Sequence, residues 1–159
     1  MKLLDKQELG PILGYANVSL YVYDSKNEKD LQEIRKAWPL KEKTWSYETI
    51  GGLQGVLPIV EDGKLKGYNL REDYVLINLG SEEDLTGEIL SHELTHLAFE
   101  IYKELKLPLD YSEPAALLVG NLNRIWSKIL SYEINKEKNE IKEMEEREYS
   151  QMMENEGRM

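Results

Sequence analysis

The sequence predicts an α+β fold, a small mixed or antiparallel sheet with two principal helices packed beside it, and three observations support this class. Residues 18–23 alternate between polar and apolar side chains and are rich in β-branched and aromatic types, as strands are. Residues 74–79 form an apolar run that ends at Gly80, which is typical of a second strand. Helical periodicity then follows, over about residues 82–105 and again from Pro114 onward.

The first half of the chain is expected to contain one helix and a pair of strands. Asp24 and Ser25 are residue types that end strands and cap helices, so a helix is predicted over about residues 26–38, where apolar side chains share one face. The Gly-rich region 44–68 has a strand-like composition, and Glu61–Lys64 has the form of a turn between two strands.

The two principal helices carry recognisable start and stop signals. Ser81–Asp84 has the form of an N-cap followed by acidic residues in a first turn, and the predicted helix over about 82–105 ends before Pro108. Pro114 suits the first turn of the next helix, because that position needs no backbone N–H. The apolar positions of this second helix recur at core spacing: Leu118, Leu122, Ile125, Trp126, Ile129 and Leu130.

The last 28 residues, 132–159, differ in composition from the rest of the chain, with nine Glu and five Lys or Arg. This composition predicts a charged helical extension or a solvated tail, and a helix that binds a protein partner is the alternative. We therefore expect one domain over residues 1–131, followed by an acidic C-terminal segment over 132–159.

Composition restricts the function before any motif is considered. The net charge of −10 argues against binding nucleic acid through a basic face, and it favours solubility, mimicry of nucleic acid or a basic partner. The chain has no cysteine, which excludes disulfides, thiol catalysis and Cys-ligated zinc, so any metal site must use His, Asp and Glu. No apolar run approaches a membrane span, and acidic residues interrupt the N-terminus where a signal peptide is apolar. We expect a cytoplasmic protein that has no membrane partner.

Both histidines of the chain fall in one short motif, H-E-x-x-H, at His92-Glu93-Leu94-Thr95-His96. Residues four apart on a helix lie on one face, about 5–6 Å apart at Cβ, so two imidazoles at this spacing can converge on one Zn²⁺. Glu93 points about 100° around the helix, where it can accept a proton from a water on the metal. The alternative is a pair of structural histidines, or a metal site without catalysis.

A catalytic zinc site needs a third protein ligand and an open position. With no other histidine and no cysteine, that ligand must be Asp or Glu. Glu113 is the preferred candidate, because it begins the next helix 17 residues after His96, across a loop long enough to reverse direction. Asp110, in the same loop, is the alternative ligand. Glu100 falls on the histidine face and is expected to be a solvated carboxylate or a partner of a ligand.

These residues resemble those of the zincin metallopeptidases, and specifically the gluzincin arrangement of H-E-x-x-H plus a glutamate on a downstream helix. The closer resemblance is to small phage- and prophage-encoded metallopeptidase-like proteins with a strand, H-E-x-x-H and then E-P-x-A-x-x-x-G, which this chain has at Glu113–Gly120. The resemblance covers about a third of the chain. It implies a minimal zincin-like fold with zinc bound by His92, His96 and Glu113, and with Glu93 as the general base.

The expected function is therefore zinc-dependent hydrolysis of peptide bonds in a peptide or protein substrate, in the host cytoplasm if the protein is phage-encoded. One departure from the resembled pattern is Leu117, where an aromatic residue, often Tyr, is usual. The alternative is a catalytically inactive binding protein on a zincin scaffold, an acidic inhibitor or nucleic-acid mimic. For the strand at 74–79, an exposed edge that pairs with a peptide and a buried central position are both considered, and its apolar run favours burial.

Overall fold

The computed structural model describes residues 1–9, 17–38, 40, 44–81, 86–106 and 112–158, with the side chains of residues 70, 71, 112–114 and 137 outside the description. The chain divides into two compact units, Met1–Ser127 and Lys128–Met159.

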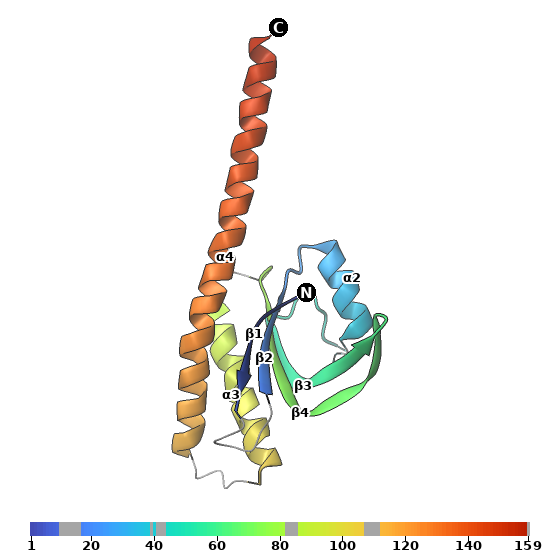
Figure 1. Cartoon of the computed structure of the whole chain (residues 1–159), viewed down its shortest axis with the longest axis vertical. Helices are drawn as coiled ribbons and strands as arrows, with labels where there is room; N and C mark the ends of the chain where they lie inside the picture. Colours follow the sequence, from blue (N-terminus) through green and yellow to red (C-terminus); the bar gives the residue numbers. More distant parts are fainter. Residues whose placement is uncertain (10–16, 39, 41–43, 82–85, 107–111, 159) are drawn as a thin grey trace. The chain divides into compact units, whose positions relative to one another are not determined.

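The first unit is built on a mixed sheet, with four strands in the part of the chain that the structure describes (Figure 1). These are β1 (Lys2–Glu8), β2 (Asn17–Tyr23), β3 (Gly52–Glu61) and β4 (Lys64–Asn78), in the spatial order β1-β2-β4-β3. The central strands β2 and β4 run parallel, and the outer strands β1 and β3 pair antiparallel with β2 and β4. The predicted α+β class with a small mixed sheet is therefore confirmed.

Most of the strand pattern agrees with the sequence prediction. The predicted turn lies at Asp62 and Gly63, where φ values of 51° and 70° give the left-handed backbone that an Asp-Gly hairpin turn requires. The predicted strand at 74–79 forms the end of β4, between β2 and β3, so the alternative of an exposed edge at this position is wrong. The strand β1 was not predicted, because Lys2–Glu8 carries four charged residues among seven and lacks a clear apolar alternation.

The helix α2 (Glu28–Ala37) confirms the predicted helix, with a different N-cap. The side chain of Asn27 accepts hydrogen bonds from the backbone N–H groups of Lys29 and Asp30. Sequence had pointed to Asp24 and Ser25 instead. An Asn immediately before the first turn satisfies two of the helix's unpaired donors, so the helix begins later than expected.

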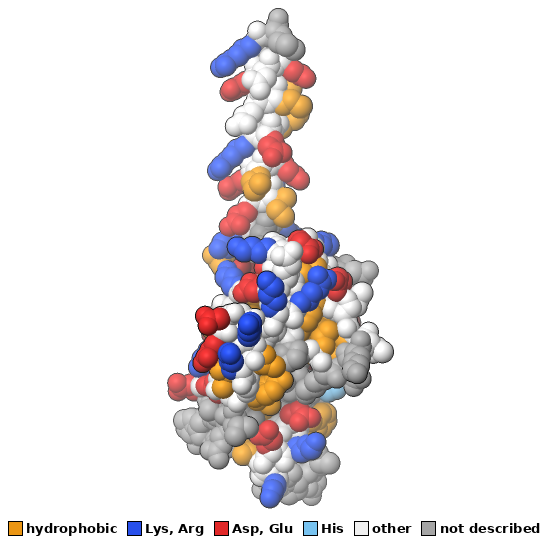
Figure 2. All heavy atoms as spheres, turned by 90° about the vertical axis from the view of Figure 1, so that its right-hand side faces the viewer, with side chains coloured by type: hydrophobic (Ala, Val, Ile, Leu, Met, Phe, Trp, Pro, Cys, Tyr) orange, Lys and Arg blue, Asp and Glu red, His pale blue; other side chains and the backbone are white. Residues whose placement is uncertain are grey.

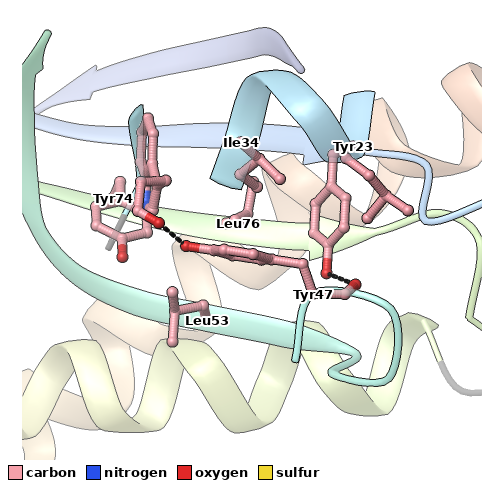
Figure 3. Close-up of a cluster of buried hydrophobic side chains, with 8 residues drawn as sticks. Tyr23, Ile34, Tyr47, Leu53, Tyr74 and Leu76 are labelled. Atoms are coloured by element: carbon pink, nitrogen blue, oxygen red, sulfur yellow. Dashed lines mark hydrogen bonds between the residues drawn. The ribbon is translucent and has the colours of Figure 1, made fainter. Parts of the chain in front are cut away.

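The face of the sheet that α2 covers is closed by a cluster of aromatic and aliphatic side chains (Figure 3). The Tyr23 hydroxyl donates to the backbone oxygen of Tyr47 at 2.8 Å, and the Tyr47 hydroxyl donates to the backbone oxygen of Trp38. The Trp38 ring meets the Tyr74 ring edge to face, with centroids 4.6 Å apart. The Tyr23 and Tyr47 hydroxyls are buried and yet hydrogen-bonded, so this cluster forms a closed core.

The opposite face of the sheet is covered by α3 (Thr86–Glu104), and α4 (Ser112–Gly157) begins in the same unit and runs back along α3 (Figure 1). Ser91 Oγ on α3 lies 3.4 Å from Asn123 Oδ1 on α4, and the Trp126 indole donates to Asp5 Oδ2 at 2.9 Å. One stripe of α3 is buried against the core and consists of Leu90, Leu94, Leu97, Ala98 and Ile101. Ser81, the predicted N-cap, donates its hydroxyl to the backbone oxygen of Asn78 at 2.6 Å, and residues 82–85, the predicted first turn, lie outside the described residues.

The second unit, from Lys128, contains the remainder of α4, which is helical up to Gly157. Charged side chains four residues apart form ion pairs along its surface, Lys142 with Glu146 and Arg147 with Glu143. Such exposed pairs each stabilise a helix by only about 0.3–0.5 kcal/mol. The predicted charged helical extension is thus a helix. None of the helices in the described ranges is long and apolar enough to cross a membrane.

Candidate metal centre and its cleft

The two imidazoles of the H-E-x-x-H motif meet on the exposed face of α3. His92 Nε2 and His96 Nε2 are 3.0 Å apart, and the ring centroids are 4.6 Å apart. Because the residues are one helical turn apart, their side chains project in the same direction. The predicted convergence of the two histidines is therefore present, with the Nε2 atom of each ring directed toward the other.

The helix holds these rings because its opposite stripe is anchored in the core. Leu90, Leu94 and Leu97 are at most 1% exposed, which fixes the rotation of α3 about its axis. With that rotation fixed, His92 and His96 fall on the exposed side. The apolar spacing thus decides which way the imidazoles face.

Glu93 lies between the imidazole face and the sheet. Its side chain is partly buried. Burial raises the pKa of the Glu93 carboxyl above its usual value, and the neighbouring His92 and His96 partly offset that rise. The Glu93 carboxyl group is therefore partly shielded from solvent and lies close to the imidazoles.

A cavity of about 650 Å³ opens along the histidine face, between α3 and the beginning of β3. Its wall on α3 consists of three turns of the helix, and its other wall consists of β3 and the segment before it. The lining residues are Trp45, Ile50, Gly51, Gly52, Leu53, Gln54, Glu88, Ile89, His92, Glu93, His96 and Glu100. The site is thus a cleft with room for part of an extended chain.

Two glycines allow β3 to lie close to α3 at this point. A Cβ atom added to Gly52 would lie 2.8 Å from Ile89 Cγ2 and 3.0 Å from Glu93 Cγ, both too close for an undisturbed contact. A Cβ atom added to Gly51 would lie 2.6 Å from Ile89 Cδ1. The glycines therefore set the width of the cleft beside Glu93.

The free edge of β3 faces outward along this cleft. The Asn78 N–H donates to the Gly51 oxygen at 2.8 Å, which identifies Gly51 as bonded to β4. Antiparallel pairing alternates, so the N–H and C=O groups of Gly52 and Gln54 point away from β4. In the described sheet β3 is an outer strand, and these groups are available to another extended chain.

The third ligand is not settled by the described residues. Glu113 lies in the first turn of α4, as sequence predicted, but its side chain is outside the described part, and Asp110 is outside it altogether. Within the described residues, no group of three His, Cys, Asp or Glu side chains is placed to hold a metal ion. Glu113 and Asp110 therefore stay predictions.

Sequence reasoning did not single out several residues that line the cleft. Glu88 lies four residues before His92, so the spacing that links the two histidines also places it on their stripe. Trp45 and the glycines of β3 reach the cleft through the fold of the sheet. No local pattern in the sequence connects them to α3.

Comparison of the chain with family models, with curated proteins and with solved structures finds no match in any of the three.

Proposed function

We propose that this protein is a zinc-dependent hydrolase of peptide bonds. The observation that carries the proposal is the contact between His92 Nε2 and His96 Nε2 at 3.0 Å, inside a cleft that Glu93 also lines. Two nitrogen ligands of a tetrahedral zinc ion, each at about 2.0–2.1 Å, lie about 3.3 Å apart. A small rotation of either ring closes this difference, so the imidazole pair fits zinc.

The residues that would hold the ion are His92, His96 and, from the sequence, Glu113 with Asp110 as the alternative. A zinc ion in this position supplies Lewis acidity, polarising a carbonyl group and making a water molecule more acidic. Without a metal, the same contact is a hydrogen bond between the two imidazoles, in which the tautomer decides which ring donates.

Glu93 performs the proton transfers in the proposed reaction. Its carboxylate takes a proton from the attacking water as the bond between water oxygen and carbonyl carbon forms. It then gives that proton to the amide nitrogen as the carbon–nitrogen bond breaks, which leaves a free amine and a carboxylic acid that loses its own proton to solvent. Glu93 suits this role because it is partly buried beside β3 and close enough to His92 and His96 for their charges to act on its carboxyl group.

The edge of β3 supplies the means to hold a peptide. The outward N–H and C=O groups of Gly52 and Gln54 can pair with the backbone of an extended substrate, as in β-strand addition. Backbone pairing of this kind orients the scissile bond without requiring a particular side chain. A cytoplasmic peptide or protein is the expected substrate.

Metal content is the first test. We expect about one zinc ion per chain by elemental analysis of protein purified without a metal-affinity step, and loss of that zinc in His96→Ala. Thr95→Ala, an exposed position on the same turn of α3, is the matched control and should keep the metal. Wild-type protein that takes up no zinc on titration would contradict the proposal and favour an inactive binding protein.

Activity of the zinc-loaded protein is the second test. Glu93→Gln should retain the fold and the zinc but lose hydrolysis of a peptide mixture by at least about 100-fold, which is the usual contribution of a general base. Retained activity would remove Glu93 from that role. Glu113→Ala should lower the affinity for zinc sharply, and unchanged affinity would transfer the ligand role to Asp110 or elsewhere.

A further inference from the structure

The charged side chains that line the cleft all have the same sign. Glu88, Glu93 and Glu100 are in the lining, and no Lys or Arg is among the lining residues that the structure describes. A second cavity, of about 670 Å³ between α2 and the β3–β4 hairpin, is lined by both Lys and Glu side chains, including Lys29 and Lys36. The uniform sign is therefore a property of this cleft and not of every cavity in the protein.

The surface around α2 also differs from the cleft, because it carries charges of both signs. Figure 2, which looks at the side of the first unit that bears α2, shows Lys and Arg side chains gathered there among acidic ones. Lys29, Arg35 and Lys36 are exposed on that helix. Among the described residues, the charged side chains of the cleft are all carboxylates, whereas the surface around α2 carries both signs of charge.

Glu88 and Glu100 occupy the two ends of the histidine stripe. Glu88 lies four residues before His92, and Glu100 lies four residues after His96, so each is about one turn, or 6 Å along the axis, from the nearer imidazole. Both side chains are exposed, and among the described residues neither forms an ion pair nor joins the imidazoles in a metal-holding group. They are available to a ligand in the cleft.

Trp45 adds an aromatic surface to the same cleft. Its side chain is 44% exposed, although tryptophan is usually buried when no ligand covers it. The face of an indole ring attracts Lys and Arg side chains within about 6 Å. The indole ring and the carboxylates of the cleft both attract a cationic side chain, the ring through a cation–π contact and the carboxylates through their charge.

We propose that the cleft selects peptides that carry Lys or Arg on both sides of the bond that is cut. This inference rests on the proposed function, whose reaction centre it uses. Glu88 and Glu100 are about 18 Å apart along α3, the length of five or six residues of extended chain, with the imidazole pair midway. Basic side chains two or three residues from the scissile bond then reach the two carboxylates.

The electrostatic balance supports this selection when metal is present. Three carboxylates outweigh the two positive charges of a zinc ion held by neutral imidazoles, so the cleft stays negative. A cleft lined by one sign of charge concentrates ligands of the opposite sign. Acidic peptides are excluded by the same field.

The experiment compares three peptides with one apolar centre and with Lys, Gln or Glu at the flanking positions. For zinc-loaded wild type we expect kcat/KM to fall in the order Lys, Gln, Glu, by about tenfold from first to last, and the difference to shrink in 0.5 M salt. Glu88→Gln and Glu100→Gln should each reduce the preference for Lys over Gln about threefold. Glu61→Gln, an exposed carboxylate outside the cleft, should leave the preference unchanged.

Binding separates this inference from the proposed function. The affinity of each peptide for the Glu93→Gln protein is measured by titration calorimetry, which needs no hydrolysis. Tighter binding of the Lys peptide that depends on Glu88 and Glu100 would support charge selection even if the wild type cuts nothing. Hydrolysis of all three peptides at equal rates would overturn the charge selection and leave the hydrolase standing. No binding and no hydrolysis would overturn both.

Discussion

The two faces of the sheet are closed in different ways. On the side of α2, Tyr23, Tyr47 and Tyr74 fill the space between helix and strands, and each is at most 4% exposed. On the side of α3, Gly51 and Gly52 lie at the start of β3 and have no side chains, so the helix packs close to them. The surface beside this contact stays open as the cleft. The α2 face is thus filled by aromatic side chains, whereas the α3 face combines buried leucines with an open cleft beside β3.

The largest loss of stability is expected from a substitution in the aromatic cluster under α2. Tyr23→Ala removes a side chain that is 1% exposed and the hydrogen bond that it donates, so the free energy of unfolding should fall by about 3–5 kcal/mol. His96→Ala, at an exposed position, should change it by less than about 0.5 kcal/mol. Urea denaturation in the presence of a chelator measures both. Equal losses would show that the cleft face contributes to folding as much as the aromatic face does.

The next effect tests the close approach of β3 and α3. Gly52→Ala places a Cβ atom against Ile89, Glu93 and the backbone oxygen of Leu76, so we expect a loss of about 1–3 kcal/mol. Gly67→Ala is the matched control, because nothing lies within 4 Å of its added Cβ atom, and it should be neutral or stabilising by up to about 1 kcal/mol. Thermal denaturation of the two variants decides the matter, and indistinguishable midpoints would contradict the close contact.

The same contrast explains which features sequence could predict. The strand over 18–23 and the hairpin turn at Asp62–Gly63 depend on local periodicity and turn chemistry, and both were predicted. The convergence of His92 and His96 also followed from helical spacing alone. These features need no knowledge of what packs against them.

Other features depend on contacts between distant segments. Trp45 lines the cleft because the chain before β3 passes beside α3, more than 40 residues later in the sequence. Gly52 is recognisable as a close-approach position only when the strand that it begins has been placed beside the helix. The strand β1 was missed because its pairing with β2 overrides the weak strand pattern of its own residues. Such tertiary placement is not encoded in any single window of sequence.

The smallest expected effect is a pH dependence of the free energy of unfolding that comes from Tyr23. Burial raises the pKa of Tyr23 well above 10, so the folded protein keeps this phenol protonated where the unfolded chain ionises it. The folded state then binds the extra proton, and the free energy of unfolding falls as pH rises through 10.

Tyr23→Phe removes that dependence, because phenylalanine has no proton to lose. The variant loses the hydrogen bond to the Tyr47 oxygen at every pH, but relative to wild type it should regain about 0.4 kcal/mol between pH 7 and pH 10. Urea denaturation of both proteins at the two pH values gives this double difference, and a repeat at pH 8 sets the baseline. A difference in free energy of unfolding between the two proteins that stays the same at pH 7 and pH 10 would contradict the prediction. It would mean that the Tyr23 hydroxyl ionises as readily in the folded protein as in the unfolded chain.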